Sequence, residues 1–228
     1  MTSRHLRIGY GALLCAMLLG STGCSTEKNR LQMLVTNCLD PSGETYCSTC
    51  QSPRTEGGCV ADDACTRTTE VWRETSNYVA IRDRKMCGCG DPGFIHGLAI
   101  PRALISGVDA PNRPNGLWGF AWQTALERNI PREEIALGIN PKHDRSENQM
   151  HIHITRLRDG ARSGFAPEMS ARVSDLATVW RVAGNIAAAR GLSDYGVLVA
   201  AGTEGDFVVV VDEGSPEDRF MRARCPKR

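Results

Sequence analysis

Hydrophobic and polar positions along the last two thirds of the chain follow two periods. Alternation with β-branched residues predicts strands at residues 77–82, 97–101, 135–139, 150–157, 196–201 and 206–211. Apolar residues at helical spacing predict helices at residues 117–129, which Asn115 can cap, and at 174–190, which Gly191 ends. A short turn or helix is expected at 131–134 and a hairpin turn at 202–205. This order predicts an α+β domain built on an antiparallel sheet.

Residues 25–76 lack this periodicity. They are polar, dense in cysteine and rich in Gly, Pro and Thr, so we expect an irregular segment held together by disulfides. The expected organisation is a leader at residues 1–24, a cysteine-rich segment at 25–76 and a folded domain at 77–228.

The first 24 residues have the pattern of a secretion signal. A basic start precedes an apolar run at residues 8–19, which is shorter than the roughly 20 residues of a membrane-spanning helix. Ser21-Thr-Gly-Cys24 resembles a bacterial lipobox, in which the cysteine is lipidated, although Ser21 replaces the usual leucine. Simple signal cleavage and an uncleaved anchor are the alternatives. We expect a lipoprotein of a bacterial cell envelope, facing the periplasm and anchored to a membrane through Cys24.

The remaining cysteines agree with export. Their even number favours disulfides, and they are Cys38, Cys47, Cys50, Cys59, Cys65, Cys87, Cys89 and Cys225. Cys47-x-x-Cys50 and Cys87-x-Cys89 offer the alternative of a four-thiolate zinc site. The sequence leaves the pairing open.

The candidate chemistry lies on the strand predicted at residues 150–157. Its apolar side chains face one way, whereas His151, His153 and Thr155 face the other. One imidazole can attack a phosphorus atom while its neighbour donates to a phosphate oxygen, because neutral imidazole is nucleophilic near pH 7. The pair fits a metal site with a distant carboxylate, or a structural role, equally well.

Two further segments resemble the HIT superfamily of nucleotide hydrolases and transferases. Asn140 ends a predicted strand thirteen residues before His153, and residues 96–102 read His-Gly-Leu-Ala-Ile-Pro-Arg. Residues 136–140, 145–149 and 151–155 are similar to the CDP-diacylglycerol pyrophosphatase family, a HIT-like branch. The similarity covers roughly residues 78–157. It implies a HIT-like antiparallel sheet with flanking helices, preceded by the disulfide-stapled segment.

The resemblance also implies an activity, hydrolysis of CDP-diacylglycerol to CMP and phosphatidate, without a cofactor or metal. His153 would be the nucleophile, His151 would donate to a phosphate oxygen, and Thr155 would fix the His153 tautomer. The remaining implied substrate-binding residues are Asn140, Lys142, His143, Arg145, Asn148 and Gln149. Thr155 stands where most HIT hydrolases carry a third histidine, and residues 47–65 look longer than the family pattern.

Other features limit the alternatives. The formal net charge of +1 gives no signal for nucleic acid binding. Trp118, Phe120 and Trp122 are expected in the core, with cytosine stacking as the other possibility, and Asp144 and Glu147 are expected in solvent. The expected partners are a nucleotide-activated phospholipid and a membrane, with the oligomeric state open. Rival functions are the same chemistry on another nucleotide anhydride, nucleotidyl transfer, a metal-binding module, or a non-catalytic envelope lipoprotein.

Overall fold

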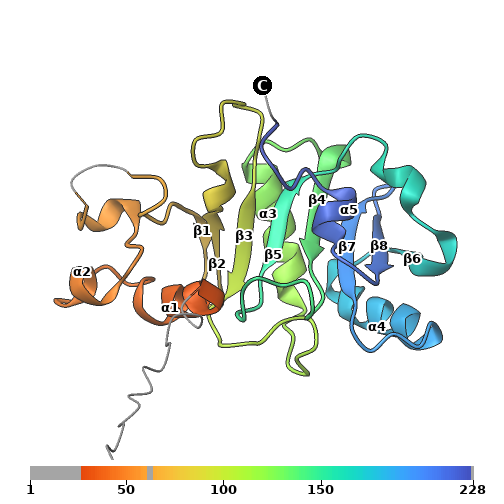
Figure 1. Ribbon diagram of the computed structural model, residues 1–228. Helices are drawn as coiled ribbons and strands as arrows, with labels where there is room; N and C mark the ends of the chain where they lie inside the picture. Colours follow the sequence, from red (N-terminus) through yellow and green to blue (C-terminus); the bar gives the residue numbers. More distant parts are fainter. Residues whose placement is uncertain (1–26, 61–63, 227–228) are drawn as a thin grey trace, which may run out of the picture.

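One eight-stranded sheet forms the centre of the computed structural model, which describes residues 27–60 and 64–226 (Figure 1). Every pair of neighbouring strands is antiparallel, in the order β1-β2-β3-β5-β4-β7-β8-β6. The strands are β1 Val71–Glu74, β2 Tyr78–Arg82, β3 Gly97–Pro101, β4 Ile135–Ile139, β5 Ile152–Arg156, β6 Ser170–Val173, β7 Gly196–Ala201 and β8 Phe207–Asp212. The α+β class with an antiparallel sheet and flanking helices is therefore confirmed.

Two helices, α3 Gly116–Glu127 and α4 Val179–Ala189, cover one face of the sheet. Ile152 and Ile154 of β5 point into this core, together with the α3 side chains. Trp118 and Trp122 are buried there, so the expectation of core packing is confirmed. Asn115 is the residue before α3, but its side chain makes no capping hydrogen bond.

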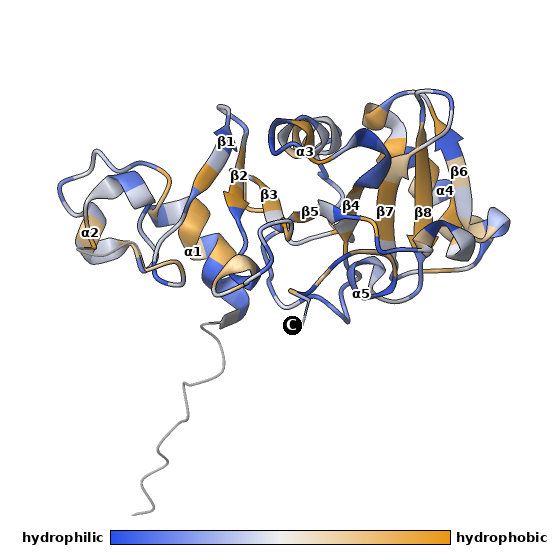
Figure 2. Cartoon of the chain, turned by 90° about the horizontal axis from the view of Figure 1, so that it is seen from above, coloured by the Kyte–Doolittle hydropathy of each residue, from blue (hydrophilic) through white to orange (hydrophobic). Residues whose placement is uncertain are grey.

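The opposite face is covered in two separate places. Helix α1 Arg30–Asn37 packs on β2 and β3, and the short helix α5 Pro216–Phe220 packs on β4 and β7. Figure 2 shows α3 on one side of the sheet and both α1 and α5 on the other. Strand β5 lies between these two covers, so the polar face of the histidine strand meets the gap between α1 and α5.

Four disulfides join the eight cysteines: Cys38–Cys50, Cys47–Cys59, Cys65–Cys87 and Cys89–Cys225. The expectation of disulfides is confirmed. The alternative of a zinc site is wrong, because Cys47 and Cys50, like Cys87 and Cys89, belong to different disulfides. The last of the four bonds ties the segment between β2 and β3 to the end of the chain.

The cysteine-rich segment has more regular structure than expected. It contains α1, the short helix α2 Tyr46–Thr49, and β1, which pairs with β2. Leu31 and Leu34 of α1 are buried against the sheet, so this segment contributes to the core. Short 3-10 helices also occur along the described residues: η1 Glu27–Asn29, η2 Thr55–Gly57, η3 Arg84–Met86, η4 Arg132–Glu134, η5 Ala161–Gly164, η6 Pro167–Met169 and η7 Leu176–Thr178.

The second predicted helix starts later than its apolar pattern suggested. The Asp175 carboxylate accepts a hydrogen bond from the backbone N–H of Ala177, which favours the turn η7 before α4 begins. Gly191, with φ of 68°, follows the end of α4 as expected. The leader and Cys24 lie outside the described residues. Within the described ranges, no helix combines the length and apolar character that crossing a bilayer requires.

Candidate active site

The two histidines of the β5 region lie side by side on the face opposite α3. Their ring centroids are 4.8 Å apart in an edge-to-face arrangement, and both side chains are buried. Leu98 of β3 and Gly138 of β4 flank His153 in the sheet. A Cβ atom at Gly138 would lie 2.4 Å from the Met221 sulfur, so only glycine allows the C-terminal segment to approach β4 here.

The surroundings of each ring define its protonation state. Nδ1 of His151 lies 2.8 Å from the backbone carbonyl oxygen of Gln149. A carbonyl only accepts, so Nδ1 carries the proton and Nε2 keeps a lone pair. Neither ring nitrogen of His153 has a hydrogen-bond partner among the described residues. Burial lowers the pKa of His153 to about 3, and the nearby Glu217 carboxylate offsets this only in part. His153 is therefore neutral at pH 7, the state in which imidazole acts as a nucleophile.

Glu217 of α5 is the centre of the polar contacts. Its carboxylate lies 3.1 Å from His96 Nε2 and 3.3 Å from His153 Nε2, and it forms an ion pair with Lys85. Asn140 Nδ2 donates to it at 3.0 Å. Burial opposes ionisation of Glu217, but neighbouring groups, Lys85 and His96 among them, outweigh this and hold the pKa of the carboxyl below its usual range. Glu217 is thus a buried carboxylate surrounded by donors.

His96 connects Glu217 to a second carboxylate. The ring is completely buried, with Nδ1 3.2 Å from Asp83 Oδ2 and Nε2 facing Glu217. Burial alone would lower the pKa of His96, but the two carboxylates raise it. Asp83 has a lowered pKa despite its burial, because His96 stabilises the charged form. The His96 ring thus lies between two carboxylates that favour its protonated form, and its edge contacts the His153 ring at a centroid distance of 5.4 Å.

The same groups contain a possible cation site. Asp83, His96 and His153 each offer one ligand atom, and these atoms all lie within 4.8 Å of one another. Two imidazoles and a carboxylate are a common donor set for zinc. The expected metal-binding alternative paired His151 with His153, whereas the structure brings His96 and Asp83 to His153.

The predicted residues in the loop before the histidines differ in how closely they approach the site. Asn140 reaches the site through Glu217, as described above. The Gln149 side chain donates to the backbone carbonyls of Pro101 and Ala103 and accepts from the N–H of Ile105, so it fixes the loop after β3. Arg145 pairs with Asp109 at 2.8 Å and lines a small pocket beside His151, together with Asn140.

Three predicted residues point elsewhere. Lys142 and His143 are exposed, and their backbone N–H groups donate to Asp194, which also binds the His143 ring at 2.7 Å. The Asn148 side chain donates to Asn29 in η1. The structure therefore does not place these three side chains against the histidines.

Two expectations need correction. Thr155 does not bond the His153 ring. Its hydroxyl donates to the backbone carbonyl of Ile95 at 2.6 Å, and this fixes the segment that carries His96. Glu147 is buried rather than solvated, because it accepts hydrogen bonds from the Arg30 side chain and the Leu31 N–H at the start of α1.

Sequence reasoning missed Asp83, Lys85 and Glu217. Asp83 directly follows a correctly predicted strand, and a carboxylate at the end of a strand was a signal that the sequence offered. Glu217 had none, because it lies on a five-residue helix that no pattern indicated.

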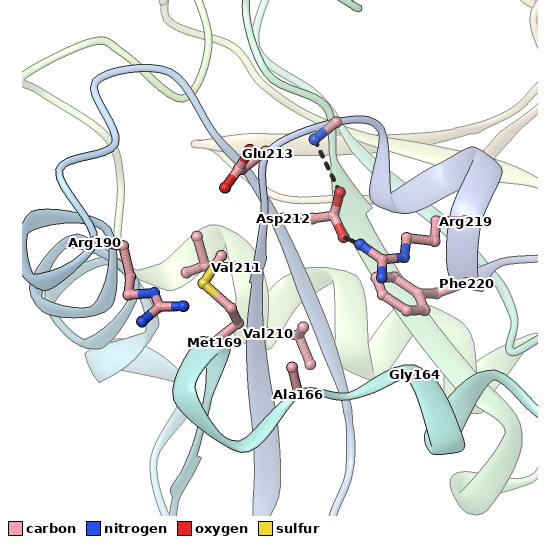
Figure 3. Close-up of a pocket in the computed structure, with 11 residues that line it drawn as sticks. Gly164, Ala166, Met169, Arg190, Val210, Val211, Asp212, Glu213, Arg219 and Phe220 are labelled. Atoms are coloured by element: carbon pink, nitrogen blue, oxygen red, sulfur yellow. Dashed lines mark hydrogen bonds and ion pairs between the residues drawn. The ribbon is translucent and has the colours of Figure 1, made fainter.

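The pocket beside His151 has a volume of only about 10 Å³, roughly one water molecule. A larger hollow of about 380 Å³ lies on the other side of α5, against β8 (Figure 3). Arg219 of α5 faces this hollow and pairs with Asp212 at 2.7 Å, whereas Glu217 faces the histidines. The larger hollow is therefore separate from the titratable cluster.

Comparison with known families identifies the family of the chain. A model of a family described as CDP-diacylglycerol pyrophosphatase matches residues 58–193, more than half of the chain. The matched segment contains His151 and His153, together with Asp83, Lys85, His96 and Asn140. Glu217 lies beyond its end.

Proposed function

The chain belongs to the CDP-diacylglycerol pyrophosphatase family, whose members are CDP-diacylglycerol diphosphatases, and from this membership we propose its mechanism. His153 attacks the phosphorus of the cytidylyl group in CDP-diacylglycerol. A nitrogen–phosphorus bond forms while the anhydride P–O bond breaks, which releases phosphatidate and leaves CMP on the histidine. Water then attacks the same phosphorus, and the nitrogen–phosphorus bond breaks to release CMP.

The observation that carries this proposal is the state of His153. The ring is neutral at pH 7, with its pKa near 3, and among the described residues neither nitrogen is engaged in a hydrogen bond. A lone pair is therefore free for attack. The His96 ring contacts His153, and Lys85 and His96 both reach the Glu217 carboxylate beside it. Fixed donors of this kind stabilise the charge that develops on phosphate oxygens.

The remaining residues take supporting roles. His151, with its tautomer fixed by Gln149, accepts or relays a proton through Nε2. Asn140 and Arg145 line the pocket beside it and bind substrate. Thr155 and Gln149 position backbone segments, and Lys142, His143 and Asn148 contribute from the rim at most.

We also propose that Cys24 anchors the chain to a membrane of a bacterial cell envelope, with the domain facing the periplasm. Four disulfides support an oxidising compartment. The start of the described chain supports an anchor near the site, because the Lys28 carbonyl accepts from the Asn148 N–H at 2.7 Å. A tether there holds the site near a lipid substrate. Radioactive palmitate should label the parent protein but not Cys24→Ala, and equal labelling of both would contradict the anchor.

A metal-assisted hydrolysis is the second candidate, because Asp83, His96 and His153 could hold a cation. In that case His153 would be a ligand rather than the nucleophile. The two mechanisms differ in the intermediate that they form, since only the first attaches CMP to the protein.

Trapping the intermediate tests the proposal. The full-length protein in detergent is mixed with CDP-diacylglycerol labelled in the cytidine, quenched in alkaline denaturant, digested and examined by mass spectrometry. We expect the CMP label on His153, located by fragmentation of the peptide that carries both His151 and His153. Label on His151 would reassign the nucleophile. Absence of label, together with turnover that stops on chelation, would favour the metal mechanism.

A further inference from the structure

The Glu217 carboxylate is held in the way that a protein holds a phosphate. Lys85, His96 and Asn140 reach it from three different elements, namely η3, the start of β3 and the end of β4. An ammonium, an imidazole N–H and an amide N–H are also the groups that bind phosphate oxygens, since both anions accept hydrogen bonds from such donors. The three side chains could therefore bind either a carboxylate or a phosphate.

The distance to His153 places this cradle at the reacting position. Glu217 Oε2 lies 3.3 Å from His153 Nε2. Reacting atoms in a near-attack arrangement are separated by about 3–3.5 Å. A phosphate in the place of the carboxylate would thus put an oxygen at this distance from the ring nitrogen that lacks a hydrogen-bond partner, with the phosphorus one P–O bond further away. A small shift of the phosphate would bring its phosphorus to the near-attack distance.

We propose that Lys85, His96 and Asn140 form the binding site for the attacked phosphate, and that Glu217 occupies this site until substrate displaces its carboxylate. This inference rests on the proposed function, because it assumes that the ligand is the diphosphate of the substrate. It assigns ligand-binding roles to Lys85 and His96 and a gating role to Glu217.

The charges of the cluster support an exchange of anions. Asp83 stays beside His96 when Glu217 leaves, and it also accepts a hydrogen bond from the Lys85 N–H at 2.9 Å. With Glu217 in place, the Lys85 ammonium is paired with its carboxylate. Without Glu217, the Lys85 charge is free to attract a phosphate.

The geometry of the site supports displacement as well. His96, His153 and Glu217 are all buried, so a diphosphate can reach these groups only if the carboxylate moves away. Glu217 sits on a five-residue helix, and Ser215 caps that helix by accepting from the Asp218 N–H. Rotation of the Glu217 side chain would empty the cradle while this cap stays in place.

Inorganic phosphate is the probe for the test, with binding measured by isothermal titration calorimetry on the full-length protein in detergent. Glu217→Gln removes the competing charge and keeps the side-chain shape, so the phosphate Kd should fall at least tenfold. Adding Lys85→Gln to this variant should reverse the gain. Glu213→Gln is the matched control, because Glu213 lies at the hollow on the other side of α5, and its Kd should equal that of the parent (Figure 3).

A Kd for Glu217→Gln equal to or higher than that of the parent would overturn the inference. Should this variant fail to fold, Glu217→Asp decides in its place, because the shorter side chain withdraws the charge and should also lower the Kd. Phosphate binding needs no turnover. Tighter binding without CMP release would therefore contradict only the proposed function, whereas CMP release with unchanged phosphate affinity would contradict only this inference.

Discussion

The disulfide Cys89–Cys225 joins two parts of the chain that together build the site. Cys89 follows the segment that carries Asp83 and Lys85, and Cys225 follows the helix that carries Glu217. The two cysteines are 136 residues apart, and the other three disulfides all lie before Cys89. This bond alone closes the long loop.

The chain-entropy model gives the size of the effect. For a sequence separation of 136, the loss of loop-closure entropy in the unfolded state corresponds to about 5 kcal/mol of stability at 25 °C. The disulfide Cys47–Cys59 spans 12 residues and lies in the cysteine-rich segment away from the histidines, and the same relation gives about 3 kcal/mol. The paired variant Cys89→Ser/Cys225→Ser should therefore lose about 2 kcal/mol more than Cys47→Ser/Cys59→Ser.

Urea unfolding at 25 °C, followed by tryptophan fluorescence, measures both losses under oxidising conditions. CMP release from the variants that remain folded gives a second readout. We expect the Cys89/Cys225 variant to lose more activity, because α5 is no longer tied to the β2–β3 segment. Equal stability losses, or a larger loss for the short loop, would contradict the dependence of stability on loop length.

Three further predictions concern packing, the contact of α1 and pH. Gly97→Ala should destabilise the protein by about 1–3 kcal/mol in thermal denaturation, since its Cβ would lie 2.1 Å from the Trp72 ring. In contrast, the added Cβ of Gly119→Ala in α3 meets nothing within 4 Å, so this variant should stabilise the protein by about 0.5–1 kcal/mol. Glu147→Gln should speed hydrogen exchange in α1, because it weakens two hydrogen bonds to that helix; unchanged exchange would show that α1 is held by other contacts. Burial lowers the pKa of His153 to about 3, whereas in the unfolded chain it stays near 6.5. The unfolded state therefore binds more protons between these values, so stability should fall as the pH falls through this range, by up to about 1.4 kcal/mol per pH unit. His153→Gln should flatten this slope in urea titrations, and an unchanged slope would contradict the assignment.

Much of the sheet follows from the sequence because its strands carry strong local patterns. The alternation around His151 and His153 correctly separated a core face from a polar face, since a side-chain period of two leaves no other choice once one face is buried. Strands β1 and β6 and helix α5 were missed. Each is five residues or shorter, and its position depends on pairing or packing with distant segments.

The site was only partly predictable for the same reason. His153 and Asn140 are close in sequence and belong to neighbouring strands, so a local motif brings them together. Glu217 reaches His153 because α5 packs on β4 and β7, a contact between segments far apart in the sequence. Lys142 and His143 are close to the histidines in sequence and were expected to bind substrate. In the structure this basic run turns outward and contacts Asp194.

The most direct test of the account compares CMP release by the full-length protein and its His153→Ala variant, in detergent with CDP-diacylglycerol and excess chelator. If His153 is the nucleophile, the parent releases CMP under these conditions and the folded variant, checked by its thermal midpoint, does not. CMP release by the variant at the parent rate, or loss of the parent activity on chelation, would contradict a histidine nucleophile at this position.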